Sequence, residues 1–342
     1  MTRRRNILVT GGGGYIGSHA CVALADAGYD VVSVDDHSTT SAQSIDKVRR
    51  LVTRPIPSYS LDINNRVELT EIIRRHDIYA VMHFAARKAV GESTQIPLQY
   101  FDINVGGTAS LLRAMWDAGV HRLIFSSSCS IYGDGVGGPF NEQSPPRPTN
   151  PYAWSKLTCE QMVRQASEYH PGFRSISLRY FNPVGAHPSG LIGEDPTGVP
   201  HNIMPYLNQV AIGRRTRLSI YGDDYPTPDG TAIRDYIHVS DVVDGHLMAL
   251  EHIDDCDEMQ TLNLGTGVGT SVLQLRAAFE SACGRNIPYD IEPRRAGDVP
   301  ELVADPSEVH RRWGWAPRYA LAEMCRDAWH FQVMNPHGYE AM

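Results

Sequence analysis

The first half of the chain alternates short apolar runs with longer stretches in which apolar residues recur at helical spacing. Five of the apolar runs are typical of buried strands, at residues 6–10, 30–36, 79–86, 123–128 and 175–182. Between them, residues 98–118 and 152–169 have the pattern of amphipathic helices. Strands that alternate with helices need crossover connections, so this pattern predicts an α/β fold with a doubly wound parallel sheet.

The pattern changes near Pro183, beyond which Gly, Pro, His and Asp become frequent. We therefore expect a first domain over residues 1–183 and a smaller, discontinuous C-terminal lobe over residues 184–342. Strand-like and helical runs return over residues 233–266. That segment is expected to contribute elements back to the first domain.

The first apolar run ends in a glycine-rich turn that precedes a helical stretch. Gly11, Gly14 and Gly17 have the spacing G-x-x-G-x-x-G, and Gly12, Gly14 and Gly17 also fit G-x-G-x-x-G. Either register removes side chains, so that the backbone can approach a pyrophosphate at a helix N-terminus. A glycine run can also be a plain flexible turn. Its position between a strand and a helix favours phosphate binding.

An acidic residue, Asp35, ends the second apolar run, about twenty residues after the glycines. A carboxylate at this position accepts hydrogen bonds from an adenine ribose and repels a 2′-phosphate. Together with the glycine turn, Asp35 predicts that the chain binds NAD rather than NADP.

Hydroxyl groups end the fourth apolar run, and a Tyr/Lys pair follows on the next predicted helix. Ser128 is the last residue of that run, and Tyr152 and Lys156 are four residues apart, on one helix face. A phenol has a pKa near 10, so it needs a neighbouring cation to act as a base at neutral pH. Lys156 is placed to be that cation. Such pairs are also common on ordinary amphipathic helices, so the pair alone does not establish catalysis.

Composition and charge narrow the class of protein. The chain has 342 residues with a net charge of −8, which gives no electrostatic reason to bind nucleic acid or an anionic membrane. No apolar run is long enough to predict a membrane span. Six widely spaced cysteines predict reduced thiols and a cytoplasmic location. The fourteen histidines lack metal-ligand spacing, so no metal site is predicted.

Five longer strings carry a more specific signal, and they span residues 10–19, 88–93, 180–190, 234–239 and 293–298. Together they resemble the extended short-chain dehydrogenase/reductase family over nearly the whole chain, and within it the enzymes that invert C4 of UDP-hexoses. The resemblance implies a Rossmann-type fold, tightly bound NAD and a UDP-hexose substrate. It also implies a homodimer formed through the helices at residues 98–118 and 152–169.

The resemblance also implies an isomerase reaction that interconverts UDP-glucose and UDP-galactose. Tyr152 would take the proton of the sugar 4-hydroxyl, and Ser128 would form a hydrogen bond to that oxygen. Lys156 would hold the nicotinamide ribose and lower the tyrosine pKa. Hydride transfer from C4 to NAD would give a 4-keto sugar, which turns over in the pocket before the hydride returns to its opposite face.

The resemblance places two further sets of residues. The positions matched to the cofactor are Gly11, Gly14, Tyr15, Ile16, Gly17, Asp35, Asp36, His37, Ser38, Asp62, Ile63, Phe84, Ala85, Ala86, Lys88, Asn104, Ser126, Tyr152, Lys156, Tyr180 and Phe181. The positions matched to the substrate are Lys88, Ser128, Tyr152, Asn182, Asn202, Ile203, Tyr221, Arg234, Arg295, Asp298 and Leu302. Arg234 and Arg295 could instead form surface ion pairs, but two phosphates need cationic forks of this kind.

Leu302 differs from the family pattern, in which a large tyrosine at this position crowds out an N-acetyl group. Because leucine is intermediate in size, we expect turnover of UDP-glucose and UDP-galactose with some acceptance of their N-acetylated forms. Two other functions stay open: a sugar-nucleotide 4,6-dehydratase and a non-catalytic NAD-binding scaffold. Cys129 and Ser130 stand where a dehydratase would carry an acid/base pair, and a scaffold has no need of Ser128, Tyr152 and Lys156 together.

Overall fold

The computed structural model describes residues 5–134, 138–295 and 297–339. The chain divides into two compact units, each assembled from separate stretches. The first unit contains Met1–Ser128, Asn150–Arg179 and Val243–Leu262. The second unit contains Cys129–Thr149, Tyr180–Val242 and Asn263–Met342.

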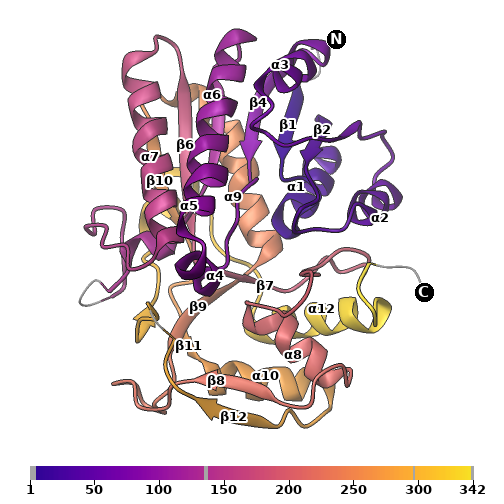
Figure 1. Ribbon diagram of the computed structural model, residues 1–342, viewed down its shortest axis with the longest axis vertical. Coiled ribbons are helices and arrows are strands. Elements are labelled where there is room, and N and C mark those ends of the chain that lie inside the picture. The colour runs from indigo at the N-terminus through magenta and orange to yellow at the C-terminus, as the bar shows by residue number, and fades with distance from the viewer. Residues whose placement is uncertain (1–4, 135–137, 296, 340–342) are drawn as a thin grey trace. The chain divides into compact units, whose positions relative to one another are not determined.

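The first unit is built on a sheet that, in the described part of the chain, has seven strands in the order β10-β6-β5-β4-β1-β2-β3 (Figure 1). The strands are β1 (Asn6–Thr10), β2 (Asp30–Asp35), β3 (Ser58–Ser60), β4 (Ile78–His83), β5 (Arg122–Ser128), β6 (Arg174–Tyr180) and β10 (Gln260–Leu264). β1 pairs in parallel with both β2 and β4, so the strand order reverses between them. Ligands bind at such a switch point in open α/β sheets. The predicted doubly wound, Rossmann-type sheet is confirmed.

Helices connect these strands and pack against the sheet. They include α1 (Tyr15–Asp26), α2 (Gln43–Leu51), α3 (Arg66–Arg75), α4 (Val90–Gln95), α6 (Gly107–Asp117), α7 (Pro151–Tyr169) and α9 (Val239–Glu251). Leu8, Val81, Leu111 and Phe125 belong to one buried cluster, which joins the strands to the helices. Burial of such apolar side chains supplies most of the favourable free energy of folding.

Two sequence predictions differ in detail from the first unit. The apolar run predicted at residues 79–86 leaves the sheet after His83, so residues 84–86 form a loop beyond β4. The single helix predicted at residues 98–118 is divided into α5 (Pro97–Tyr100), a π-helical turn (Phe101–Gly106) and α6. The apolar periodicity is similar in all three segments, so it could not reveal the change in hydrogen bonding.

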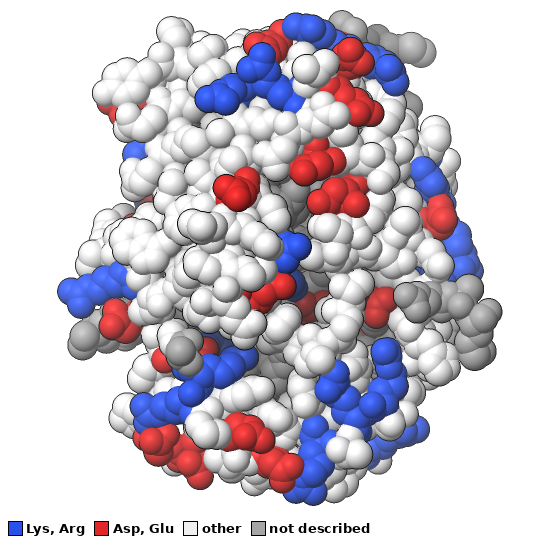
Figure 2. Space-filling model, in the orientation of Figure 1, with Lys and Arg blue, Asp and Glu red and all other residues white. Residues whose placement is uncertain are grey.

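The second unit contains shorter strands and its own apolar core. β9 (Ile233–His238) pairs with β7 (Asn182–Val184), β11 (Gly269–Ser271) and β13 (Glu301–Leu302), and β8 (Leu218–Tyr221) pairs with β12 (Tyr289–Glu292). The helices include α8 (Ile203–Ala211), α10 (Val272–Cys283), α11 (Ser307–Trp313) and α12 (Leu321–Met334). Leu207, Ile220, Phe279 and Ala328 lie in the core that these elements enclose. Figure 2 shows charges of both signs interspersed over one face of the molecule.

All six cysteines are free thiols, and each of them except Cys283 is buried. Burial raises the pKa of Cys21 and of Cys325 to about 12, so these side chains stay protonated and unreactive at neutral pH. Among the described helices, none combines the length and the hydropathy that a membrane span requires.

Candidate functional site

The glycine turn after β1 brings the backbone into close contact with the loop that follows β4. Gly11 has a positive φ of 72°, and a Cβ atom there would lie 2.6 Å from the amide nitrogen of Ala85. A Cβ atom at Gly17 would lie 2.1 Å from the carbonyl oxygen of Gly11. Both positions therefore require glycine. Gly14 is the N-cap of α1, which has no side-chain cap and no acidic residue in its first turn, as suits a helix N-terminus that binds an anion.

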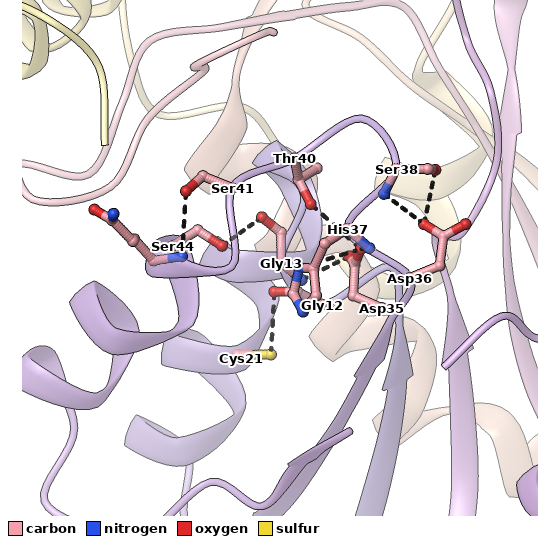
Figure 3. A network of polar contacts seen from close by, with 11 residues as sticks. Gly12, Gly13, Cys21, Asp35, Asp36, His37, Ser38, Thr40, Ser41 and Ser44 are labelled. Atoms are coloured by element: carbon pink, nitrogen blue, oxygen red, sulfur yellow. Dashed lines mark hydrogen bonds and ion pairs between the residues drawn. The ribbon is translucent and has the colours of Figure 1, made fainter. Parts of the chain in front are cut away.

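Asp35 ties the end of β2 to the glycine turn (Figure 3). Its carboxylate accepts hydrogen bonds from the amides of Gly13 at 2.9 Å and His37 at 2.8 Å, and from the hydroxyl of Thr40 at 3.3 Å. A carboxylate offers about four acceptor sites, so capacity remains for a ribose hydroxyl. Asp36 instead closes a local turn, because it accepts from the amide and the hydroxyl of Ser38.

Other residues matched to the cofactor lie around the same edge of the first unit. Lys88 is exposed, with its ammonium 5.9 Å from the centre of the Tyr15 ring. The ring of Phe84 lies 4.7 Å from that of His246 on α9, and Ala85 and Ala86 follow it in the loop. Ile16 lies in the first turn of α1. Asp62 is exposed and accepts from the amide of Asn64, whereas Ile63 is buried against Gly107.

Asn104 is buried, and its side-chain amide links two elements of the first unit. Its oxygen accepts from the amide of Arg87 at 2.8 Å, and its NH₂ group donates to the carbonyl of Arg87 at 3.0 Å. The same NH₂ group donates to the hydroxyl of Ser155 at 2.9 Å. Asn104 therefore fastens the loop before Lys88 to α7.

Ser128, Tyr152 and Lys156 are all buried in the first unit, on β5 and α7, which pack against each other. α7 begins where it does because Asn150 caps it by accepting from the amide of Ala153 at 2.9 Å, and Pro151 occupies its first turn. This start places Tyr152 and Lys156 one turn apart on the helix.

Lys156 is anchored on the strand that carries the serines. Its ammonium donates to the carbonyl of Ser126 at 2.8 Å and lies 5.2 Å from the centre of the Phe125 ring. Burial lowers the pKa of Lys156 from its usual 10.5 to about 8, and nearby Cys159 and Glu160 partly oppose that change. At pH 7 the side chain is therefore still mostly protonated, and its charge lies in a desolvated position where it acts strongly on its neighbours.

A buried ion pair beneath α7 was missed by the sequence reasoning. Arg179 on β6 donates from Nε to Glu160 at 2.9 Å and from Nη2 at 2.7 Å. The hydroxyl of Ser177 donates to the same carboxylate at 3.1 Å. Glu160 lies four residues after Lys156, so its helical spacing was a signal that could have been used. The pair fixes α7 on the sheet and places a negative charge one turn beyond Lys156.

His83 at the end of β4 is a second residue that the sequence did not single out. Its ring nitrogens lie 2.7 Å from the hydroxyl oxygen of Thr10 and 3.1 Å from that of Thr108. Burial, with a further contribution from the charge of Lys156, lowers the pKa of His83 to about 3. The ring is therefore neutral at physiological pH and adds no positive charge beside the glycine turn.

In the second unit, a cluster that we call the arginine cluster consists of Tyr221, Arg234, Arg295 and Asp298. Asp298 lies 2.9 Å from Arg295 and 3.8 Å from Arg234, so two guanidinium groups share one carboxylate. The guanidinium of Arg295 also lies 4.7 Å from the centre of the Tyr221 ring. Leu302 is the register partner of Arg234. The cluster has a net positive charge, as a site for a diphosphate requires.

The remaining predicted residues lie elsewhere in the second unit. Asn182 pairs with Tyr236 on β9, and its buried side-chain oxygen has no hydrogen-bond partner among the described residues. Asn202 is the N-cap of α8 and donates to Glu194 at 2.6 Å, and Ile203 begins that helix. No hydrogen bond or ion pair of the described residues joins Asn202 to the arginine cluster. Tyr180 ends β6, and the amide of Phe181 donates to the carbonyl of Leu264.

Comparisons with known proteins agree over both units. A model of the NAD dependent epimerase/dehydratase family matches residues 7–265. The UDP-glucose 4-epimerase of Yersinia pestis is 48% identical over 97% of this chain and 99% of its own length. The crystal structure of UDP-glucose-4-epimerase from Stenotrophomonas maltophila, with bound NAD and formylated UDP-arabinopyranose, has a TM-score of 0.94 and 46% identity, covering 97% of this chain and 99% of that one. The Bifidobacterium longum enzyme in complex with NAD⁺ and UDP also has a TM-score of 0.94, with 42% identity and the same coverage.

Proposed function

Because the chain belongs to the NAD-dependent epimerase/dehydratase family, we propose that it is an isomerase that interconverts UDP-glucose and UDP-galactose at C4. The observation that carries the proposal is the joint burial of Ser128, Tyr152 and Lys156 in the same unit as a glycine turn suited to a dinucleotide. Its similarity to UDP-glucose 4-epimerases over nearly its whole length supports the same reaction.

The residues of the first unit fit NAD. Gly11 and Gly17 remove side chains where the backbone must approach a pyrophosphate, and the uncapped N-terminus of α1 would bind its charge. Asp35 would accept hydrogen bonds from the adenine ribose and repel a 2′-phosphate. When bound, NAD supplies a hydride acceptor and donor for the sugar C4. Asn104 would act indirectly, by fixing the loop that carries Lys88.

The chain's own catalytic task is to move a proton at the sugar O4. We assign Tyr152 as the base that removes this proton and later returns it, with Ser128 bound to the same oxygen. For the phenol to ionise at neutral pH its pKa must fall by about three units, which corresponds to about 4 kcal/mol. The buried ammonium of Lys156 favours the phenolate, and Asn150 and Glu160 hold the helix that positions both side chains.

The second unit would bind the UDP moiety. The arginine cluster offers two guanidinium groups to the pyrophosphate, while the hexose needs a looser fit so that the 4-keto intermediate can turn over. Leu302 lies beside Arg234 in the sheet and is smaller than tyrosine. We therefore propose that N-acetylated UDP-hexoses also react. A purified protein that forms no UDP-N-acetylgalactosamine from UDP-N-acetylglucosamine would contradict this extension.

We also infer a cytoplasmic homodimer. Leu98 on α5 is 76% exposed and Trp154 on α7 is 50% exposed, so both helices offer apolar surface to a second copy of the chain. The six free thiols fit a reducing compartment. Sedimentation of a single monomeric species at micromolar concentration would contradict the dimer.

The proposed function is tested by incubating the purified protein with UDP-galactose without added cofactor. We expect UDP-glucose to accumulate until the two sugars reach equilibrium, and NAD to be released when the protein is denatured. A 4-keto-6-deoxy sugar product would instead indicate the dehydratase reaction. Bound NAD without any turnover would indicate a non-catalytic scaffold.

A further inference from the structure

We propose that Asp235 is a positioning residue that keeps residues 301–305, here called the specificity segment, in register with Arg234. In this way Asp235 would couple the binding of the diphosphate by Arg234 to the selection of the hexose by Leu302. The proposal rests on the proposed function, because it takes Arg234 and Leu302 as neighbours of the substrate. Asp235 itself would not touch the substrate, since successive side chains of a strand point to opposite faces.

The carboxylate of Asp235 is fully buried and accepts hydrogen bonds from three residues that are distant in sequence. Thr266 donates its hydroxyl at 2.6 Å and its amide at 2.9 Å, and the amide of Gly267 donates at 2.9 Å. The amide of Ala304, within the specificity segment, donates at 3.2 Å. A single side chain of β9 therefore holds both the loop that follows β10 and the segment that follows β13.

The specificity segment needs such support because its strand is very short. β13 contains only Glu301 and Leu302, which pair with Ile233 and Arg234. Paired residues of neighbouring strands lie on the same face of a sheet, so this register places the side chains of Leu302 and Arg234 side by side. Beyond Leu302 the strand pairing ends, and the bond from Ala304 to Asp235 continues the attachment to β9.

Phe140 holds the same segment by its main chain. Its amide donates to the carbonyl of Val303 at 2.8 Å, and its carbonyl accepts from the amide of Asp305 at 2.8 Å. The side chain of Asn263 in turn donates to the carbonyl of Phe140 at 2.9 Å. Residues 303–305 are therefore held by two partners, of which Asp235 is the one that also belongs to the strand of Arg234.

The packing around Asp235 is close, and Gly265 next to it has no room for a side chain. A Cβ atom at Gly265 would lie 2.4 Å from Cβ of Ala304 and 2.7 Å from Oδ2 of Asp235. Asparagine has the size of aspartate, but its NH₂ group would face amide donors that need an acceptor. Asp235→Asn therefore removes hydrogen bonds without creating a cavity.

The test compares wild type with Asp235→Asn. We expect amide hydrogen exchange in residues 301–305 to become about tenfold faster and the Kd for UDP, measured by calorimetry, to rise about tenfold. The KM for UDP-galactose should rise by a similar factor, while kcat changes less than about threefold. The ratio of kcat/KM for UDP-N-acetylglucosamine to that for UDP-glucose should change at least about threefold, since Leu302 loses its fixed position.

Asp241→Asn is the matched control. Asp241, in the first turn of α9, a turn that belongs to the second unit, is another buried carboxylate, and it accepts hydrogen bonds from the amides of Arg318 at 3.0 Å and Tyr319 at 3.3 Å on a different segment. The Asp241→Asn variant should have a lower melting temperature. Amide hydrogen exchange in residues 301–305 and the ratio of the kcat/KM values for the two substrates should stay unchanged. If both variants change the ratio equally, or if Asp235→Asn lowers only the melting temperature, the role of Asp235 is purely structural and the proposal is wrong.

Two further measurements keep the test decisive. If Asp235→Asn does not fold, Thr266→Ala removes the 2.6 Å hydroxyl bond to Asp235 together with the 3.2 Å bond that the same hydroxyl accepts from the amide of Val268, and exchange in residues 301–305 should rise about two- to threefold. Unchanged exchange in that variant contradicts the proposal. If the wild type fails to convert UDP-galactose, the proposed function fails, whereas the exchange experiment still decides whether Asp235 holds the segment.

Discussion

The two candidate sites of this chain differ in how far their charged side chains are exposed to water. In the first unit, Lys156 is buried, donates to a strand carbonyl and has a pKa lowered to about 8 by desolvation. In the second unit, the arginine cluster is more open, with 47% of the Arg295 side chain exposed and 14% of Arg234. A buried charge acts strongly on a nearby reacting group, whereas an exposed one is weakened by water and salt.

The difference in exposure fits the two tasks that we propose for these sites. Proton transfer at O4 needs a fixed cation in a low-dielectric position, so that a phenol can ionise. Binding of a diphosphate needs charges that can exchange water for ligand at low cost. Changes in the first site are therefore expected to act on kcat, and changes in the arginine cluster on KM and on the Kd for UDP.

Tyr152→Phe should have the largest effect. Removing the hydroxyl removes the proposed base, so kcat should fall about 10³-fold, within the range known for general acid–base groups. NAD should remain bound, because the glycine turn and Asp35 are untouched. The measurement is turnover of UDP-galactose together with the NAD content of the denatured protein. If the variant keeps full activity, Tyr152 is not the base.

Lys156→Met should lower kcat about 10²-fold and also change how stability depends on pH. The pKa of Lys156 is about 8 in the folded protein and near 10.5 when unfolded, so the unfolded chain binds more protons between these values. The free energy of unfolding of the wild type should therefore rise by about 3 kcal/mol, relative to the variant, as the pH increases from 8 to 10.5. Chemical denaturation of both proteins across this range measures the difference.

The same lysine predicts a pH dependence of the reaction. Above about pH 8 the ammonium loses its proton, and the stabilisation of the Tyr152 phenolate that we propose for it would be lost. We expect kcat/KM to fall as the pH rises through that region. Lys156→Arg should retain the charge to higher pH, because a guanidinium does not titrate there. A profile that is flat to pH 10 in the wild type would contradict this role.

Arg234→Met should raise the Kd for UDP about 30-fold, and Arg295→Met about fivefold, with kcat little changed in both. The order follows from exposure, because the more buried guanidinium pairs with phosphate in a lower dielectric and loses more when it is removed. Calorimetry with UDP gives both values. Equal losses would mean that exposure does not distinguish the two arginines. Arg217→Met, which breaks an exposed ion pair with Asp290, serves as the matched control.

The sequence predicted the first unit better than the second for a physical reason. β1, β2, β5 and β6 are apolar runs of five to seven residues, which periodicity can detect. β13 has two residues and β11 has three, so no period can be read from them. The partners of Asp235 are far apart in sequence, and nothing local marks them. The site roles inferred from resemblance stay predictions until variants are measured.

Asn104 illustrates the limit in the first unit. Its position in the chain matched a cofactor-side residue, but its side chain contacts Arg87 and Ser155 and links a loop to α7. An asparagine at this position of a helix is compatible both with a direct contact to the cofactor and with a supporting role. The partners that show the supporting role lie 17 and 51 residues away in sequence, and the match to a cofactor-side position stays a prediction.

Salt should give the smallest effect, and it tests the comparison without any substitution. An increase in ionic strength from about 0.05 M to 0.5 M shortens the screening length from about 14 Å to about 4 Å. The exposed side chain of Arg295 is screened, so the KM for UDP-galactose should rise about threefold. Lys156 is only 5% exposed and is therefore screened much less, so kcat at saturating substrate should change less than about 1.5-fold. Steady-state kinetics across the salt series separates the two parameters, with potassium chloride and potassium acetate compared to exclude a specific anion. A parallel fall in kcat would mean that water and ions reach Lys156, and that the two candidate sites do not differ in solvation as we propose.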